Sequence, residues 1–470
     1  DKVDWLIASA ARVSSTQTDQ VVDVYPCTPT QRSLVERTVV LPGAYWLHNA
    51  FEIPAELDIA RLERAWLEVV EAHAILRTRI FTVDDQHLQA VLRQPDPVRH
   101  MSAASLTKFL AADRTRAFTY GEPLLRAVVL TEPSDDQCRR YFVLTFHHSV
   151  YDVWSLTKIF GLLEGIYARL GCPEEADDGG EYQEVGFKYF VKALQDQDRG
   201  IALDFWKKYL LGTKTKPLVP PSTNTQANSM LRYKISLPLT GGLKAAGSSV
   251  THAVMTYAAL GLAFNRQLQS ADTVMRLISM GRSTAGVPGI EDLVGPTITT
   301  APLRINHTGK ATLHDYLAHV HAQVRRLTPF EQIGLDDISH VHSDAEQACL
   351  SAPQIVVHPD DPYTQQPAAG LGLQRRELSA FNDDGVLFTM DISLVLQGKA
   401  LEALDIRVVF DGHVVPGDNV RRLVVDLECI MQQIWEAPGS SHSDTPLDTI
   451  QRSVAETDGL DLEVERISSA

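Results

Sequence analysis

Residues 141–155 read Tyr141-Phe-Val-Leu-Thr-Phe-His-His-Ser-Val-Tyr-Asp-Val-Trp-Ser155, a run of β-prone residues that ends on two adjacent histidines and an aspartate. Apolar residues then recur at three-and-four spacing from Leu156 to Leu170, and Gly171 follows. This stretch predicts a buried strand, a turn at residues 147–152 and an amphipathic helix. Asp152 stands where it can cap that helix.

The two histidines of the turn are candidates for proton transfer. A histidine at a strand end can project into a cleft, where its near-neutral pKa suits acid–base chemistry. His147 and His148 are neighbours in an extended segment, so their side chains point to opposite faces, and packing is the default role of His147. From the residues alone, a catalytic His148 and a purely structural pair remain open alternatives.

Strand and helix signals alternate along the rest of the chain, which predicts an α/β fold. In the first half we expect a helix at residues 57–70 and a strand at residues 75–81. A helical piece follows at residues 187–211. In the second half we expect strands at 273–279 and 405–410, and helices at 251–268, 313–327 and 417–435.

The length of the chain predicts two lobes, because 470 residues are more than a single hydrophobic core usually supports. Residues 172–186 are acidic and contain glycine, and residues 213–229 are rich in Thr, Pro, Ser and Asn, which marks a seam. We therefore expect a linker at 1–20, a first lobe at 21–175, a connecting segment at 176–230, a second lobe at 231–437 and a flexible tail at 438–470.

Charge and cysteine usage exclude several classes of protein. The net charge of −16, from 43 basic and 59 acidic residues, disfavours nucleic acid and anionic membrane surfaces as partners. The five cysteines are scattered and form no CxxC pair, so neither a disulfide framework nor a zinc cluster is indicated. The longest apolar stretch, residues 253–264, is too short to span a bilayer. These features predict a cytoplasmic protein.

Other histidines do not form a metal pattern. His314, His319 and His321 share one expected helix, and His340 and His342 follow, but none stands with a carboxylate at the spacing of a catalytic metal site. The sequence therefore predicts no metal site.

Several motifs, taken together, carry a family resemblance. The run from His147 to Asp152 resembles the HHxxxD motif of condensation domains of nonribosomal peptide synthetases, which are relatives of chloramphenicol acetyltransferase. Further segments are similar to the family's other motifs in the same order, the first of them in its fungal form: Val24–Gln31, His73–Phe81, Gly281-Arg282 with Gly289–Gly295 and Pro302–Arg304, and Pro329–Glu331.

The resemblance implies an α/β fold of two acetyltransferase-like lobes, which form a V-shaped pseudo-dimer with a central tunnel. It implies an acyltransferase-type amide synthase that binds no cofactor of its own. The substrate is a peptidyl thioester that arrives on the 4′-phosphopantetheine arm of a carrier domain. The partners are peptidyl carrier domains of the same synthetase.

The resemblance also implies roles for particular residues. His148 would act as the base or orient the amine, with His147, Asp152 and Ser155 as the other members of the catalytic set. Ser155 completes an HxxxDxxS pattern, and its hydroxyl either reaches the tunnel or bonds to the backbone of the first helical turn.

Three arginines are expected to support the architecture. In the family, Asp152 pairs with the arginine of the second motif, which is Arg77 here, and this pair holds the structure more than it serves the chemistry. Arg282 and Arg304 are expected to be structural too.

Two departures from the family pattern bear on the reaction. Val153 replaces the glycine that usually follows the motif aspartate, and Thr299 stands where the family has asparagine. These departures and the fungal-type motifs favour a terminal domain that releases a cyclic product by intramolecular condensation. Chain elongation between two carriers and a non-catalytic docking module are the alternatives, with epimerisation as a minor one. The retained His147 speaks against the terminal type, which often has serine there.

Overall fold

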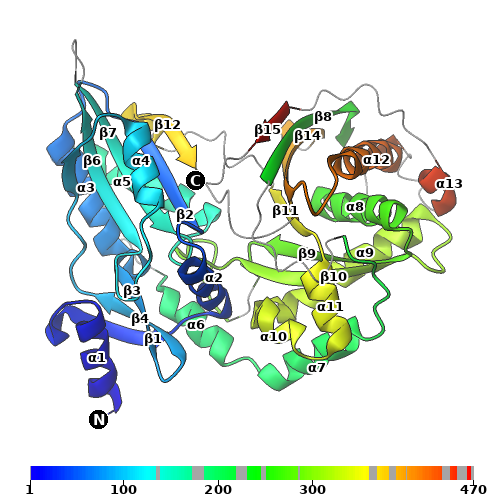
Figure 1. The fold of residues 1–470 in the computed structure, drawn as a ribbon, viewed down its shortest axis with the longest axis horizontal. Helices are drawn as coiled ribbons and strands as arrows, with labels where there is room; N and C mark the ends of the chain where they lie inside the picture. The colour runs from blue at the N-terminus through cyan, green and yellow to red at the C-terminus, as the bar shows by residue number, and fades with distance from the viewer. Residues whose placement is uncertain are drawn as a thin grey trace.

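The computed structural model describes residues 2–133, 138–171, 185–218, 230–244, 250–283, 286–358, 368–379, 388–397, 400–436, 445–452 and 463–466. Two lobes lie side by side, the first drawn in blue and cyan and the second in green to red (Figure 1). Among the described residues, the strands form sheets of three, five and seven strands. The expected α/β fold with two lobes is therefore confirmed.

The first lobe is built on the five-stranded sheet, whose order is β12-β2-β7-β6-β5. Its central strand β7 pairs antiparallel with β2 and β6. The elements up to residue 171 are α1 (Lys2–Val13), η1 (Thr18–Gln20), β1 (Val21–Pro26), α2 (Pro29–Val40), β2 (Trp46–Glu52), α3 (Ile59–Ala72), η2 (Ala74–Arg77), β3 (Thr78–Val83), β4 (Gln86–Leu92), β5 (Arg99–Ser102), α4 (Leu106–Arg114), β6 (Leu125–Glu132), β7 (Arg139–His147) and α5 (Val153–Gly171).

Helices α3 and α5 cover one face of this sheet. Trp66 of α3 meets Phe142 of β7 edge to face, with ring centroids 5.8 Å apart. Phe160 of α5 meets Phe51 of β2 at 5.4 Å. Burying each such aromatic side chain contributes roughly 1.5–3 kcal/mol, so this packing fixes α5, and the turn before it, on the sheet.

The second lobe is built on the seven-stranded sheet, whose order is β10-β9-β11-β13-β14-β8-β15. Strand β9 shows how both faces are covered, because Met275 and Leu277 join the large core of α8 and α12 while Val274 packs on α11. The elements are α6 (Phe187–Gln195), α7 (Arg199–Leu210), β8 (Met230–Lys244), α8 (His252–Leu268), β9 (Asp272–Ser279), β10 (Thr299–Asn306), α9 (Leu313–Leu327), η4 (Thr328–Ile333), α10 (Leu335–Ser339), α11 (Ser343–Ser351), β11 (Gln354–His358), η5 (Ala369–Leu371), β12 (Gln374–Ser379), β13 (Phe388–Gln397), β14 (Ala400–Asp411), α12 (Gly417–Glu436), α13 (Leu447–Arg452) and β15 (Glu463–Arg466).

Two segments of the second half cross into the first lobe. Strand β12 pairs antiparallel with β2 and forms the edge of the first sheet, where its yellow ribbon stands out among blue and cyan strands (Figure 1). The loop before β10 places Val287, Ile290, Leu293 and Val294 in the hydrophobic core of the first lobe. Their burial joins the two lobes at the N-terminal end of α5.

The predicted linker at residues 1–20 is wrong for its first part. Residues 2–13 form α1, and Ala10 and Ala11 are buried against Phe81 and Leu88 of the three-stranded sheet, whose order is β1-β4-β3. Because small apolar residues face one side of this segment, it packs as a helix even though the residues that follow are Ser/Thr-rich.

The predicted flexible tail contains ordered elements too. Strand β15 pairs antiparallel with β8, and α13 packs near α12 with Leu447 and Ile450 buried. The backbone of β15 completes the edge of the seven-stranded sheet, which a reading of composition does not reveal. The parts of the seam at 172–184 and 219–229 lie outside the described residues.

Most expected elements match the structure, with two corrections. The helical piece at 187–211 divides into α6 and α7, because the Asp198 side chain accepts from the N–H groups of Gly200 and Ile201 and caps a new helix. The strand expected at 75–81 begins instead as the 3₁₀ turn η2, and β3 starts at Thr78. Both differences arise at caps and turns, where periodicity carries little information.

Candidate active site

The turn between β7 and α5 holds the candidate residues at the junction of the two lobes. Strand β7 ends at His147, and the Val150 N–H donates to the His147 carbonyl over 3.0 Å. Helix α5 begins at Val153, where the Asp152 side chain accepts from the Ser155 N–H at 2.7 Å. Asp152 therefore caps α5 as predicted.

His148 lies directly after β7 and is partly exposed. Its ring stacks on that of Tyr151, with centroids 4.8 Å apart, and its Nδ1 lies 2.8 Å from the Tyr151 carbonyl oxygen. Because a carbonyl only accepts, Nδ1 carries the proton, and in the neutral ring Nε2 has the lone pair. Burial lowers the pKa of His148, against which the Tyr151 carbonyl and Asp152 raise it. The ring is thus a neutral base at ordinary pH.

His147 is buried on the opposite side of the backbone. Its Nε2 lies 2.9 Å from Thr38 Oγ1, and its Nδ1 lies 2.7 Å from Ser149 Oγ. The ring meets Trp46 edge to face and stacks on Phe118. Burial lowers the pKa of His147 to about 3, so this ring stays neutral. The expected packing against the opposite face is confirmed.

The Asp152 carboxylate is the centre of a buried network that joins the lobes. Nη2 of Arg282 lies 3.0 Å from each of its oxygens. Thr297 donates to the same carboxylate through its N–H at 3.2 Å and its hydroxyl at 3.1 Å. Asp152 lies in the first lobe, whereas Arg282 and Thr297 come from the second, so the network holds the turn between β7 and α5 to both lobes.

The predicted pairing of Asp152 with Arg77 is wrong. The Arg77 guanidinium donates to the backbone carbonyls of Val70, Glu71 and Leu92, which ties the end of α3 to the end of β4. Arg77 remains a supporting residue of the first lobe, but its charge faces carbonyl oxygens rather than the motif aspartate. Membership in a family motif does not determine which of several arginines reaches a buried carboxylate.

Arg282 and Arg304 both lie in ion pairs. Arg282 also donates through Nη1 to the carbonyls of Ile290 and Leu293, at 2.7 and 2.9 Å. Arg304 makes a two-pronged pair with Asp272, at 2.9 and 2.8 Å, inside the second lobe. Arg282 therefore organises the loop that enters the first lobe, whereas Arg304 stabilises its own lobe.

Ser155 is buried and connects α5 to the second lobe. Its hydroxyl donates to Asp152 at 2.6 Å and accepts from the Gly295 N–H at 3.0 Å. Two more side chains of α5 reach the loop that contains Gly295: Trp154 Nε1 donates to the Glu291 carbonyl at 2.7 Å, and Lys158 pairs with Asp292 at 2.5 Å. The partners of the Ser155 hydroxyl are thus the Asp152 side chain and the backbone of Gly295, and not the backbone of the first helical turn that was expected as the structural alternative.

The two departures from the family pattern occupy different surroundings. Val153 is 40% exposed on the first turn of α5, five residues after His148. Thr299 is buried, and its hydroxyl donates to the Glu331 carbonyl at 2.6 Å. Burial raises the pKa of Glu331, whose carboxylate accepts from Ser279. Thr299 therefore serves the packing of the second lobe, while Val153 is exposed at the start of α5.

Three side chains of the site went unnoticed in the sequence. Thr297 lies two residues from Thr299 and binds Asp152. Gln31 and Thr38 of α2 bind the turn, through the Ser149 carbonyl at 2.9 Å and the His147 ring. Gln31 ends the first motif and forms a capping box with Thr28, so the pattern Thr-x-x-Gln was a usable signal. Thr38 gave none, because its partner is more than a hundred residues away.

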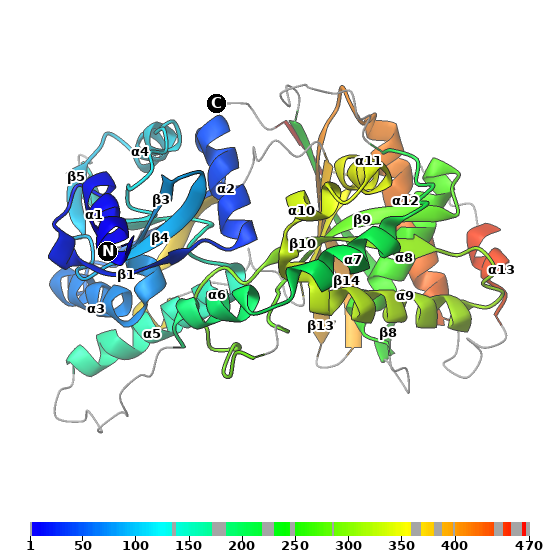
Figure 2. The same cartoon turned by 90° about the horizontal axis from the view of Figure 1, so that it is seen from below.

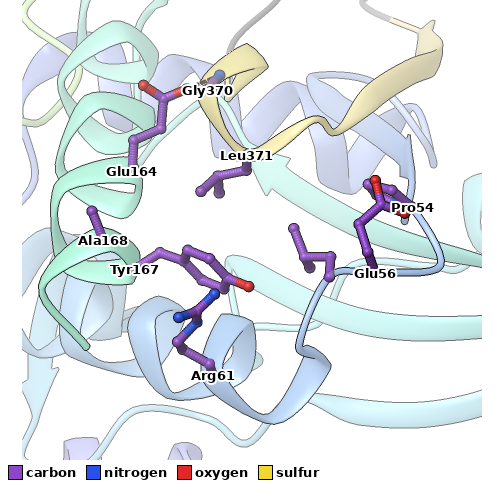
Figure 3. A pocket seen from close by; sticks show the side chains of 9 residues that line it. Pro54, Glu56, Arg61, Glu164, Tyr167, Ala168, Gly370 and Leu371 are labelled. Atoms are coloured by element: carbon purple, nitrogen blue, oxygen red, sulfur yellow. Dashed lines mark hydrogen bonds between the residues drawn. The ribbon is translucent and has the colours of Figure 1, made fainter. Parts of the chain in front are cut away.

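A separate cavity of about 510 Å³ lies on the first lobe, between α3, α5 and η5. Figure 3 shows Arg61 lying across the ring of Tyr167, 3.8 Å from its centroid, and Glu164 beside Gly370. The Glu164 carboxylate accepts from the Gly370 N–H at 2.9 Å and so anchors the segment that leads into β12. No residue of the His147–Asp152 turn lines this cavity. The cavity therefore lies beside the segment that leads into β12 and is separate from the candidate site.

Neither a membrane-spanning helix nor a metal-binding cluster occurs among the residues that the structure describes. None of their helices combines the length and apolar character that crossing a membrane requires. Nor do their His, Cys, Asp and Glu side chains gather in groups of three or more that suit a metal ion.

Comparisons with known proteins agree with the motifs and the geometry. The condensation domain family model matches residues 21–447. Nonribosomal peptide synthetase GRA1 of Gibberella zeae is 34% identical over 432 residues, which are 90% of this chain and 5% of that protein. The chain thus spans a small part of this relative's length.

Solved structures share the fold. The crystal structure of holo T3CT has a TM-score of 0.71 at 19% identity and covers 93% of this chain and 97% of its own. The starter condensation domain of rhizomide synthetase RzmA has a TM-score of 0.69 at 14% identity, and the match covers 91% of this chain and 99% of that domain. Because the family model matches most of its length, the chain belongs to the condensation domain family found in fungal nonribosomal peptide synthetases.

Proposed function

We propose that this chain forms an amide bond, in which an amine attacks the carbonyl carbon of a peptidyl thioester carried on a phosphopantetheine arm. The observation that carries the proposal is the placement of His148. It is partly exposed at the junction of the lobes, its Nδ1–H donates to Tyr151, and its lowered pKa keeps Nε2 unprotonated. Such a ring can accept a proton as the amine nitrogen becomes positively charged.

The proposed reaction balances without a cofactor. The amine nitrogen bonds to the thioester carbon and forms a tetrahedral intermediate, and His148 Nε2 takes the proton that the nitrogen loses. The carbon–sulfur bond then breaks, and the proton passes from His148 to the departing thiolate. The products are an amide and the free thiol of the carrier arm.

The other residues of the candidate set act on His148 through the protein. Asp152 holds the end of the turn by capping α5 and binding Arg282. Ser155 holds the second-lobe loop against that cap. His147 anchors the turn in the core, and Arg77 and Arg304 stabilise their own lobes. In this proposal only His148 touches the reacting atoms.

We favour intramolecular condensation, in which the attacking amine belongs to the donor peptide and a cyclic product is released. The support is Val153, whose exposed side chain adds bulk at the start of α5 where the family usually has glycine. Elongation is the alternative, with the amine on a second carrier. A docking module without chemistry is the third candidate, and the complete set of His148, Asp152 and Arg282 disfavours it.

The proposed partners are peptidyl carrier domains of the same synthetase, working in the cytoplasm. The short share of GRA1 that the chain spans supports a role as one domain among many. No cofactor of its own is needed, because the reactive thioester comes with the carrier.

Mass spectrometry of the product distinguishes the candidates. The chain is mixed with a donor carrier loaded with its peptide, with and without a loaded acceptor carrier. Loss of peptide without the acceptor, giving a product one water lighter than the linear acid, establishes cyclising release. Transfer only to the acceptor establishes elongation, and no change with a verified cognate donor favours the docking module.

The same assay tests His148. His148→Ala is expected to abolish product, and unchanged turnover in this variant contradicts the assignment. The matched control is His314→Ala, because His314 is exposed on α9 in the second lobe. This control is expected to keep the wild-type rate.

A further inference from the structure

The hydrogen bonds of His147 determine which ring nitrogen carries its proton. The backbone N–H of Ser149 donates to His147 Nδ1 at 3.2 Å, so Nδ1 must be the unprotonated nitrogen. The proton is then on Nε2, which donates to Thr38 Oγ1 at 2.9 Å. The Thr38 hydroxyl can only accept there if its own proton is used elsewhere, and the Leu34 carbonyl lies 2.8 Å away. Both ends of the ring thus agree on one tautomer.

Helix α2 and the turn after it hold three consecutive residues of the turn at 147–152, called the catalytic turn here because it carries the proposed base His148. Thr38 binds the ring of His147, and the Tyr45 carbonyl accepts from the His148 N–H at 2.9 Å. Gln31 donates to the Ser149 carbonyl at 2.9 Å. Thr38, Gln31 and Ser149 are fully buried, so water does not compete for these bonds. Helix α2 therefore holds the residues on both sides of His148, through Thr38 at His147 and Gln31 at Ser149.

Aromatic contacts keep the His147 ring from turning over. The ring of Trp46 meets its edge with centroids 4.9 Å apart, and Phe118 stacks at 5.7 Å. A flipped ring would place Nδ1 toward Thr38 and remove the acceptor for the Ser149 N–H. Leaving that donor unsatisfied in the core is unfavourable, so the observed orientation is strongly preferred.

We propose that Thr38 is a positioning residue for the reaction: by accepting a hydrogen bond from the His147 Nε2–H, it keeps Nδ1 available to the Ser149 N–H and thereby sets the path of the backbone at His148. This inference rests on the proposed function of His148 and assigns it a specific support. Thr38 and His147 touch no substrate, and their effect reaches the reaction through the path of the backbone from 147 to 149. Figures 1 and 2 show α2 on the side of the first lobe that faces the second.

Helix α2 also contacts the second lobe. Thr30 Oγ1 donates to the Ile298 carbonyl at 3.1 Å, next to Thr297, which binds Asp152. The two ends of the catalytic turn, at His147 and Asp152, are therefore both connected to the region of the lobe interface where α2 meets residues 297–298.

The test replaces Thr38 with valine, which keeps the shape and removes the acceptor. Thr38→Val is expected to lower kcat for the donor thioester by about tenfold or more with KM unchanged, as losses of a supporting hydrogen bond do. Thr38→Ser restores the acceptor and is expected to recover most of kcat. The matched control is Thr256→Val, because Thr256 is also fully buried and its hydroxyl donates to the carbonyl four residues earlier, at 2.9 Å.

A spectroscopic readout stands apart from any activity. Ring ¹⁵N shifts of labelled histidine, with the His147 signals assigned by their loss in His147→Gln, report the tautomer in the substrate-free protein. The wild type is expected to show protonated Nε2 and unprotonated Nδ1, and Thr38→Val is expected to lose this pattern. Thr38→Ser is expected to keep it.

The outcomes separate this inference from the proposed function. A wild-type His147 protonated on Nδ1 overturns the positioning role whatever the activity. So does a kcat for Thr38→Val within about twofold of Thr256→Val. An active His148→Ala variant instead defeats the function assigned to His148, while the tautomer measurement still decides the role of Thr38 in shaping the turn.

Discussion

Asp152 and Arg282 form a buried ion pair that joins the two lobes beside His148. Arg282 Nη2 lies 3.0 Å from both carboxylate oxygens, and the two side chains are 2% and 8% exposed. Nη1 of the same guanidinium donates to the carbonyls of Ile290 and Leu293. The charges are thus hidden from water, fully hydrogen-bonded on the aspartate side, and drawn from opposite lobes.

Removing one partner of this pair is expected to destabilise the protein strongly. Arg282→Met leaves the Asp152 charge buried without its counter-ion, which costs about 3–5 kcal/mol. Urea denaturation followed by tryptophan fluorescence measures the loss. A loss below about 1 kcal/mol would mean that solvent reaches the pair.

A double-mutant cycle distinguishes Arg282 from Arg77. Asp152→Asn and Arg282→Met are expected to be non-additive, because the second change removes a charge that the first has already left without a partner. Asp152→Asn and Arg77→Met are expected to be additive within about 0.5 kcal/mol, since Arg77 binds carbonyls elsewhere. Coupling of the second pair would restore the arrangement first expected from the motifs.

Ser155→Ala is expected to cost about 1–3 kcal/mol of unfolding free energy, because the buried Gly295 N–H loses its acceptor. Ser351→Ala is the control: Ser351 is equally buried in a helix, but its hydroxyl only donates to the Gln347 carbonyl. That carbonyl keeps its place in the helix, so the control is expected to lose less. Equal losses in both variants would refute the link through Ser155.

The pKa of His148 is expected below its ordinary value of 6.5, because burial outweighs the opposing Tyr151 carbonyl and Asp152. The ring therefore stays neutral as the pH falls through 6.5 and gains its proton only below. Asp152→Asn removes a negative charge that favours the imidazolium, so the midpoint is expected to move lower still. NMR titration of the ring, assigned with His148→Ala, checks both; a midpoint above 6.5 contradicts the burial argument.

His147 is expected to make the fold sensitive to acid. Its pKa is about 3 when folded and about 6.5 when unfolded, so the unfolded state binds the proton first as the pH falls. Its contribution to stability is complete above pH 6.5 and declines toward pH 3. Between pH 7 and pH 5 the expected loss is about 2 kcal/mol.

Urea melts at these two pH values measure this loss in the wild type and in His147→Gln. His73, whose pKa burial lowers to about 4, acts in the same direction in both proteins. The difference between the two proteins therefore isolates His147. An identical pH dependence in both would show that folding does not lower the pKa of His147.

Local signals in the sequence predicted much of the frame. Periodicity placed α5, α8, α9 and α12, and a capping aspartate marked where α5 begins. The motifs predicted the family and the position of His148. These predictions succeed because side-chain period and caps act within a few neighbouring residues.

The contacts that hold the site could not be predicted from the sequence. The partner of Asp152 is 130 residues away, that of His147 is 109 residues away, and strand β12 pairs with a strand more than 300 residues earlier. Composition also concealed α1 and β15, whose order depends on the sheets they join.

By itself, then, the sequence determined the strand–turn–helix, the α/β class and the histidine that stands at the turn. Only the tertiary structure decided that Arg282 pairs with Asp152 and that Thr38 accepts a hydrogen bond from His147. The reason is physical: a buried charge or hydrogen bond is satisfied by whichever group the packed chain brings within about 3 Å, and chain separation does not constrain that choice.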